Sequence, residues 1–254
     1  MDTTADQSAE ALLHALHWIH HFNTQTVVVG LTAGSFNDDQ RRKELLTDIY
    51  FLASIGARPV IIHGGSQTNE SYLDGNKNPE KEIAVGLNEK LAGEYEAIGG
   101  RAMTLNFESG SVLQGEADGN SSTGTVQSVD RIVIDNLCYA GQTPVIPAMC
   151  QSTSDQRLLV DDSAAVPFVA SSLAAKAAAI VVPELASDQK SVTACDLESF
   201  AKQSGISNAV SSAITNALEA GVESVHLINS SIPHGLLRQL FTADRPGVEI
   251  KKVI

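Results

Sequence analysis

The chain has 254 residues, with 17 Lys and Arg against 30 Asp and Glu, which gives a formal net charge of -13. This length suits one α/β domain or two closely packed lobes, and the negative charge makes nucleic acid and anionic membranes poor partners. The acidic N-terminus lacks the basic and apolar parts of a signal peptide, and no apolar stretch approaches the roughly 20 residues that a membrane-spanning helix needs. The 3 cysteines form no CxxC pair, which indicates reduced thiols and neither a disulfide framework nor a zinc site. We therefore expect a cytoplasmic protein.

Residues 11–22 carry apolar side chains at helical spacing together with several histidines. His17 and His21 stand four positions apart, so they would share a helix face and could bind a metal ion. No third ligand follows at a local spacing, which favours a polar helix face or a subunit contact over a metal site.

Strand-like and helix-like segments alternate along the remainder of the chain. This alternation predicts an α/β fold, a three-layer αβα sandwich around a mostly parallel sheet, within a single domain spanning residues 1–254. Residues 107–128 are rich in Gly, Ser and Thr and indicate hairpins or an exposed loop. The predicted strands are 26–31, 59–63, 101–105, 144–149, 180–183, 225–228 and a final edge strand at 248–254; the predicted helices are 38–55, 82–98, 130–140, 163–179, 197–203, 207–220 and 233–241.

The most informative stretch is a buried apolar strand that ends in His63-Gly64-Gly65, after which Ser66 begins a predicted helix. Glycines let backbone N–H groups turn toward a ligand, and a helix start adds partial positive charge. We therefore expect a small molecule with a carboxylate or phosphate to bind at these four residues. A purely structural strand-to-helix turn is the alternative.

Asp161 and Asp162 form a second candidate site, because they stand between a short apolar run and an Ala-rich predicted helix. Ligands of open α/β sheets bind beyond the carboxyl ends of the strands, where these aspartates could meet the glycine turn. Either aspartate could instead cap the helix.

Several blocks of the sequence resemble the N-acetyl-L-glutamate kinases of the amino acid kinase family, and the resemblance extends from about residue 8 to the end. It implies the fold of that family, ATP with Mg²⁺ as cosubstrate, and an amino-acid derivative as substrate. The family reaction, a step of arginine biosynthesis, transfers the γ-phosphoryl group to the side-chain carboxylate of N-acetylglutamate. The resemblance also implies an N-terminal helix extension at 1–24 that joins subunits into a homodimer or homohexamer, a substrate-side lobe at about 25–175 and a nucleotide-side lobe at about 176–254. The blocks are 56–65, 141–147, 162–165 and 217–242.

The chain departs from this family at the positions that supply positive charge. The two positions that hold catalytic lysines in the family hold Gly30 and Ala213 here, and the position of the substrate-binding asparagine holds Leu158. Lys176 and Arg42 are nearby basic residues, but no spacing points to either as a substitute. The positions that keep the pattern are His63, Gly64, Gly65 and Asp162, and Ser66 replaces a third glycine.

Without the lysines, a helix-capping role for Asp162 is favoured over a catalytic one. The sequence thus predicts an acetylglutamate kinase-like protein that is catalytically impaired or inactive, a pseudoenzyme. The alternatives are an active kinase, an enzyme with altered chemistry in the same cleft, and a non-catalytic paralogue that binds arginine, an acylated amino acid or a partner kinase.

Overall fold

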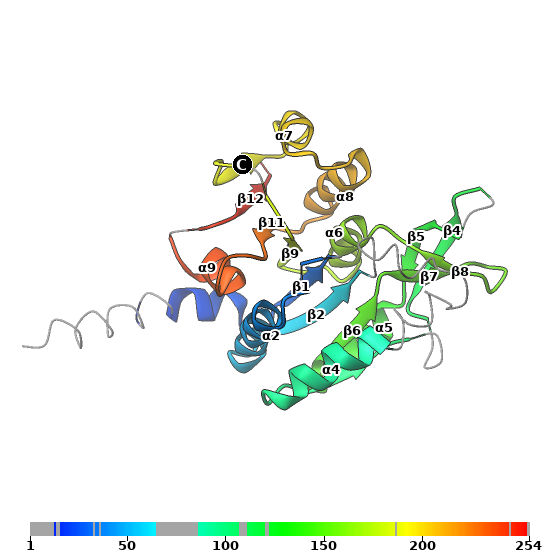
Figure 1. Cartoon of the computed structure of the whole chain (residues 1–254), viewed down its shortest axis with the longest axis horizontal. Coiled ribbons are helices and arrows are strands. Elements are labelled where there is room, and N and C mark those ends of the chain that lie inside the picture. The colour runs from blue at the N-terminus through cyan, green and yellow to red at the C-terminus, as the bar shows by residue number, and fades with distance from the viewer. Residues whose placement is uncertain are drawn as a thin grey trace, which may run out of the picture.

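The computed structural model of the protein describes residues 13, 16–32, 34–35, 37–64, 86–106, 111–119, 122–185, 187–243 and 245–252. Its centre is an 8-stranded sheet in the order β10-β12-β11-β9-β1-β2-β6-β3 (Figure 1). All neighbouring strands are parallel except β11 and β12, which are antiparallel. The strands are β1 (Thr26–Leu31), β2 (Arg58–His63), β3 (Ala102–Thr104), β6 (Thr143–Pro147), β9 (Ala177–Val182), β10 (Ser191–Thr193), β11 (Ser224–Asn229) and β12 (Val248–Lys251).

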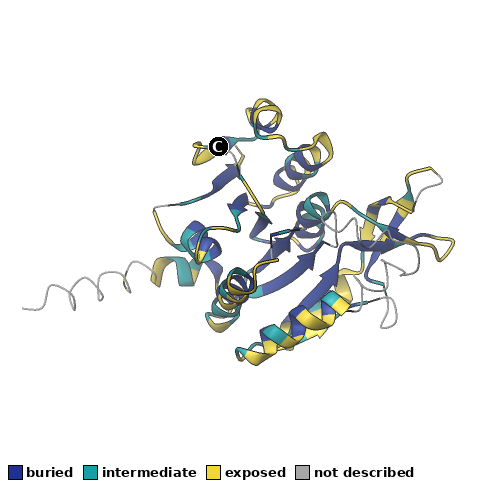
Figure 2. Cartoon of the chain, viewed as in Figure 1, coloured by how far each residue is buried: buried dark blue, intermediate teal, exposed yellow. Residues whose placement is uncertain are grey.

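Helices cover both faces of this sheet, so the predicted three-layer α/β sandwich is confirmed (Figures 1 and 2). One apolar core lies between the sheet and α5 (Arg131–Tyr139), α6 (Asp162–Ser172), α7 (Leu197–Ser204) and α8 (Asn208–Glu219). A second core lies between the opposite face and α2 (Asp39–Ser54), α4 (Asn88–Ala97) and α9 (Gly235–Phe241), together with side chains of the helical segment 16–22. Figure 2 shows the central strands buried between these two layers.

A smaller sheet in the order β5-β4-β7-β8 stands beside the carboxyl end of β6. Its strands are β4 (Leu113–Ala117), β5 (Gly124–Val129), β7 (Met149–Gln151) and β8 (Arg157–Leu159). The antiparallel pair β4–β5 confirms the hairpin expected within residues 107–128. Leu113, Val126 and Leu158 point from this sheet into the same core as α6, so the two sheets share one packing unit.

Local signals in the sequence set several helix ends. Asp38 caps α2 by accepting a hydrogen bond from the backbone N–H of Arg41 at 2.8 Å, and Gly56 follows the helix at φ 88°. Asp130 caps α5 in the same way. No helix within the described ranges combines the length and apolarity needed to cross a membrane.

Two predicted elements are wrong. The helix expected over 163–179 ends at Ser172, and Ala174 then takes a positive φ of 49° before β9 begins at Ala177. Alanine favours helices, but this strand lies between β1 and β11 in the middle of the sheet, where small side chains fit under the packed helices. The final strand is also not an edge strand, because β12 pairs with both β11 and β10.

Candidate functional site

The structure brings Gly64 and Asp162 together at the carboxyl ends of β1 and β2. A Cβ atom added to Gly64 would lie 1.7 Å from Oδ2 of Asp162, so only glycine allows the carboxylate to approach this closely. The Gly64 N–H donates to the carbonyl of Leu31 at 2.9 Å and is therefore engaged in extending the sheet. Gly65 and Ser66, the other two residues of the predicted anion site, lie outside the described residues.

The His63 side chain is fully buried and is turned toward α4. Its Nε2 lies 3.1 Å from Oδ1 of Asn88, and its Nδ1 lies 3.4 Å from the carbonyl oxygen of Gly64. Burial lowers the pKa of His63 to about 4, so the imidazole is neutral at pH 7. The imidazole thus joins β2 to α4, and it offers no positive charge to a ligand.

The capping role that the sequence left open between two aspartates belongs to Asp161. Its Oδ1 accepts hydrogen bonds from the backbone N–H groups of Ser163 at 3.0 Å and Ala164 at 3.2 Å. Asp162 is the first residue of α6, and its half-buried carboxylate faces Gly64 while accepting from Ser163 Oγ at 3.2 Å. The capping role favoured for Asp162 is therefore wrong, and its part in catalysis stays a prediction.

The two positions that hold lysines in the family and the one that holds the substrate-binding asparagine lie in three different environments. At Gly30 in β1, an added Cβ would lie 2.2 Å from Cγ2 of Val166, a fully buried side chain of α6. Ala213 is half-buried on α8, and Leu158 is fully buried in β8. The space beside position 30 is therefore filled by a neighbouring side chain.

Neither of the two basic residues considered as substitutes is placed at these strand ends. The guanidinium of Arg42 binds Glu94 through Nε at 2.6 Å and Nη2 at 2.8 Å, and it also binds Asp39, so it joins α2 to α4. Lys176 precedes β9 and pairs with Glu223, which places it at the amino ends of the strands, opposite Gly64 and Asp162.

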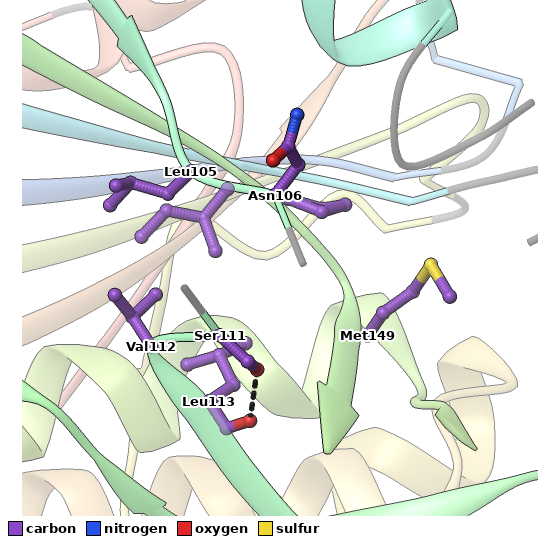
Figure 3. Close-up of a pocket in the computed structure, with 8 residues that line it drawn as sticks. Leu105, Asn106, Ser111, Val112, Leu113 and Met149 are labelled. Carbon is purple, nitrogen blue, oxygen red and sulfur yellow. Dashed lines mark hydrogen bonds between the residues drawn. The ribbon is translucent and has the colours of Figure 1, made fainter. Parts of the chain in front are cut away.

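A hollow with about 190 Å³ of empty space lies at the carboxyl ends of β3 and β6, next to the smaller sheet. Its walls are mostly apolar, with the Asn106 side chain among them and a hydrogen bond from Ser111 Oγ to the Leu113 carbonyl (Figure 3). Neither Gly64 nor Asp162 lines it. Most of its lining residues are ordinary apolar residues and they form no motif in the sequence, so sequence reasoning could not have revealed it.

Within the described ranges, no group of three or more His, Cys, Asp or Glu side chains could hold a metal ion. His17 and His21 belong to the helical segment 16–22, and His21 Nε2 lies 3.8 Å from Glu223. Cys138 and Cys150 are buried free thiols, and Cys195 is an exposed one.

A mostly parallel αβα sandwich with its candidate residues at the strand ends is the arrangement of many small-molecule enzymes. The sequence profile of the amino acid kinase family matches residues 25–229, and the chain belongs to this family. The chain is 27% identical to an acetylglutamate kinase of Bifidobacterium adolescentis, over 98% of this chain and 91% of that protein. It is 25% identical to an acetylglutamate kinase of Synechococcus sp., over 95% and 88% of the two chains.

Solved structures share this fold. The N-acetylglutamate synthase of Neisseria gonorrhoeae, complexed with coenzyme A and N-acetyl-glutamate, superposes with a TM-score of 0.79 at 22% identity and matches 97% of this chain. The match spans only 64% of the synthase chain. Carbamate kinase of Giardia lamblia, bound to citric acid, superposes with a TM-score of 0.66 at 12% identity, over 90% of this chain and 99% of that one.

Proposed function

We propose that this chain is an acetylglutamate kinase-like protein of arginine biosynthesis in which phosphoryl transfer is impaired or lost. The observation that carries the proposal is the contact at Gly30. Val166 occupies the space that a side chain at this position would need, so the position has been remodelled for packing. The region around Gly64 and Asp162 keeps the architecture of the family and lacks the lysine that resemblance places beside it.

Phosphoryl transfer to a carboxylate brings two anions together, so the reaction depends on fixed positive charge and backbone N–H groups. Removal of one such donor typically lowers the rate by about 10²–10³. Here the Gly64 N–H already donates to Leu31, and Asp162 adds a negative charge. The glycine at position 30, where the resemblance places a lysine, removes one such source of positive charge, and this supports a protein that has lost the reaction.

The direct test is an assay of ADP formation from MgATP and N-acetylglutamate. We expect no turnover above background, while the Bifidobacterium adolescentis acetylglutamate kinase serves as the positive control under the same conditions. Turnover that depends on N-acetylglutamate would overturn the proposal and favour an active kinase.

Thermal melting separates a ligand-binding paralogue from a degenerate enzyme that still binds nucleotide. A ligand at about 100 times its Kd stabilises the folded state by about 2.7 kcal/mol, which raises Tm by roughly 5–10 °C for a chain of this size. We expect no such rise with MgATP. The non-catalytic alternative, supported by the retained architecture around Gly64, predicts a rise with arginine, an acylated amino acid or a partner kinase. A rise with MgATP would indicate a degenerate enzyme that still binds nucleotide, and it would contradict the non-catalytic alternative.

We also propose that the N-terminal helix joins copies of this chain into a homodimer or homohexamer. Two leucines of this segment support the idea, because Leu13 is 70% exposed and Leu16 is 46% exposed. Light scattering should give a mass that is a multiple of 26.8 kDa, and Leu13→Glu with Leu16→Glu should reduce it. Ser199→Glu with Gln203→Glu on the exposed face of α7 is the matched control. A monomeric wild type, or an unchanged assembly in the leucine variant, would contradict this.

A further inference from the structure

The outer face of α5 is apolar and exposed to solvent. Ile132 and Tyr139 are each 73% exposed, and Val133 is also exposed. They stand on the side of the helix away from Ile134 and Cys138, which anchor α5 in the core against the sheet. These three residues are half of the six large apolar side chains that are exposed within the described ranges. Such a concentration on one short helix marks an interaction surface.

The exposed surface extends from α5 to the edge of the sheet. β3 is the last strand at this edge, and its partner in the sheet is β6, on which α5 packs. Ala102 packs into the core on the α4 side, so the alternation of side chains along a strand turns Met103 toward the α5 side. Met103 is 39% exposed there. At this edge of the molecule, α5 therefore borders an open strand (Figure 1).

Two arginines flank β6 on the α5 side of the sheet. Arg58 begins β2, where its guanidinium lies 4.7 Å from the centroid of the Tyr139 ring and donates to the carbonyl of Thr24. These contacts with a ring and a carbonyl leave the positive charge of Arg58 unneutralised. Arg101 is exposed directly before β3, and it points to the same side as Met103 because one residue separates the two.

This group of positive charges differs from the rest of the chain, which has a formal net charge of -13. A third arginine, Arg131, begins α5 and pairs through Nε with Oδ2 of Asp135 at 2.8 Å. A second copy related by a two-fold axis would bring the same arginines against one another. Charge complementarity therefore favours a partner whose contacting surface is acidic as well as apolar.

We propose that the outer face of α5 binds an amphipathic helix of another protein, with apolar residues against Ile132 and Tyr139 and acidic residues beside Arg58 and Arg101. Packed helices lie about 8–10 Å apart, so a helix along α5 would cover both apolar positions. A contact through one helix face is small, which is typical of a transient interaction. Arg58 lies at the amino end of β2, opposite Gly64, so this surface does not depend on the proposed loss of kinase activity.

Fluorescence anisotropy with two labelled peptides tests the charge preference of the full chain. The first peptide contains two copies of the repeat Leu-Glu-Ala-Leu-Leu-Glu-Ala, and the second carries lysine in place of glutamate. The net charge of the protein favours the lysine peptide, so tighter binding of the glutamate peptide reports the arginines beside α5. We expect a preference for the glutamate peptide of about fivefold, which falls as salt is raised. Equal or tighter binding of the lysine peptide, or no binding of either, would overturn the proposal.

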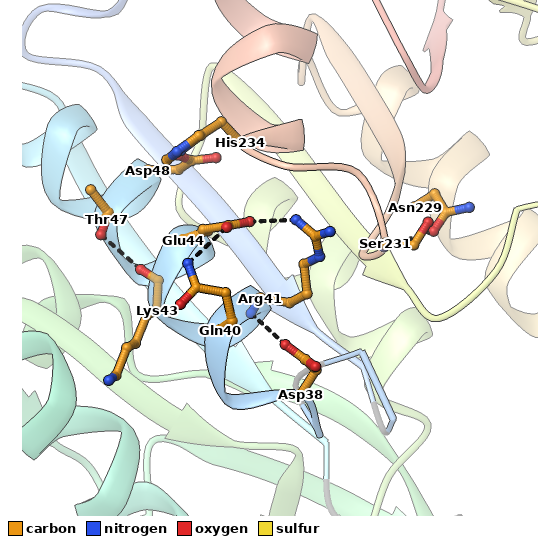
Figure 4. A network of polar contacts seen from close by, with 10 residues as sticks. All are labelled: Asp38, Gln40, Arg41, Lys43, Glu44, Thr47, Asp48, Asn229, Ser231 and His234. Carbon is orange, nitrogen blue, oxygen red and sulfur yellow. Dashed lines mark hydrogen bonds and ion pairs between the residues drawn. The ribbon is translucent and has the colours of Figure 1, made fainter.

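Substitutions locate the binding on α5. Ile132→Ser and Tyr139→Ser should each weaken binding of the glutamate peptide about tenfold, because they remove the apolar anchors. Arg101→Gln should weaken it about twofold to fivefold, as expected for an exposed ion pair. The matched control is Arg41→Gln on the opposite side of the sheet, where Arg41 Nη1 lies 2.7 Å from Glu44 Oε2 in the polar network of α2 (Figure 4). This control should keep the affinity of the wild type.

The same variants distinguish a foreign helix from a second copy of the chain. Both α5 positions are exposed, so Ile132→Ser and Tyr139→Ser should keep the Tm of the wild type and its mass in light scattering. A lower mass in these variants would show that another copy covers this face and would contradict the proposal. Wild-type affinity for the glutamate peptide in both variants would place the peptide elsewhere and contradict it as well.

Discussion

Replacing Gly30 with alanine is expected to destabilise the protein by about 2 kcal/mol, although alanine normally stabilises a strand relative to glycine. The added Cβ would lie 2.2 Å from Val166 Cγ2, a distance that requires one of them to move. A valine in a helix has one strongly preferred rotamer, and Val166 is fully buried, so it has little room to turn away. The sign of the effect therefore depends on how far Val166, the nearest neighbour of the added methyl group, can move.

A double-mutant cycle measured by urea unfolding tests this contact. Val166→Ala should destabilise the protein on its own because it opens a cavity. In the double variant the methyl group introduced by Gly30→Ala would fill part of that cavity, so the combined loss should be smaller than the sum of the single losses by about 1 kcal/mol. Additive losses would contradict direct packing between the two positions.

Lysine can be introduced at Gly30 and at Ala213, the two positions that hold lysines in the family. The loss of stability at a buried position can then be compared with the loss at a half-buried one. Gly30→Lys should cost about 3 kcal/mol or more, because it overpacks the core and buries a charge. Ala213→Lys, on the half-buried face of α8, should cost less than about 1 kcal/mol. Equal effects would mean that position 30 can accept a side chain after all. The observation behind the proposed loss of kinase activity would then be wrong.

The sequence predicted the sandwich because its signals are local. The strand predicted to end at His63 and the helix predicted over 38–55 depend on signals from their own neighbours, and the structure contains a strand at Arg58–His63 and a helix at Asp39–Ser54. The alanine run before Val182 misled the prediction, because helix propensity is weaker than the pairing of β9 with two strands far away in sequence.

The candidate site was only partly predictable for the same reason. Glycine and aspartate motifs indicated that Gly64 and Asp162 would meet, and they do. Sequence could not show that Val166 fills the space beside Gly30, since the two residues belong to elements far apart in the chain. It also could not show that the apolar outer face of α5 around Ile132 would remain exposed near the edge strand β3.

Lowering the pH from about 7 toward 4 is expected to reduce the free energy of unfolding by several kcal/mol. Burial lowers the pKa of His63 and of His226 from the ordinary 6.5 to about 4. Between these values the unfolded chain binds protons that the folded chain does not, so the stability present above pH 6.5 is lost as the pH falls. Each histidine contributes about 1.4 kcal/mol per pH unit within this window.

The hydrogen bonds of His226 show why the folded state prefers the neutral ring. Nδ1 lies 3.2 Å from Nε2 of Gln239 and accepts from this amide, while Nε2 lies 2.8 Å from Ser224 Oγ. A proton added to Nδ1 would break the bond to Gln239, whose Oε1 accepts from the Gly247 N–H at 2.7 Å. Protonation therefore disturbs the contact between α9 and the start of β12.

Urea unfolding between about pH 7.5 and pH 5, above the usual carboxylate pKa values, isolates the histidine effect. His63→Gln and His226→Gln should each remove a large part of the pH slope, and the double variant should leave only a small part that belongs to His21, whose pKa is also lowered by burial. The two single variants also lose packing, so the slope and not the absolute stability is the readout. At about pH 7.5 both histidines are neutral in the folded and in the unfolded chain, so neither contributes to the pH slope there. A double variant that keeps the wild-type slope would assign the acid sensitivity to other groups.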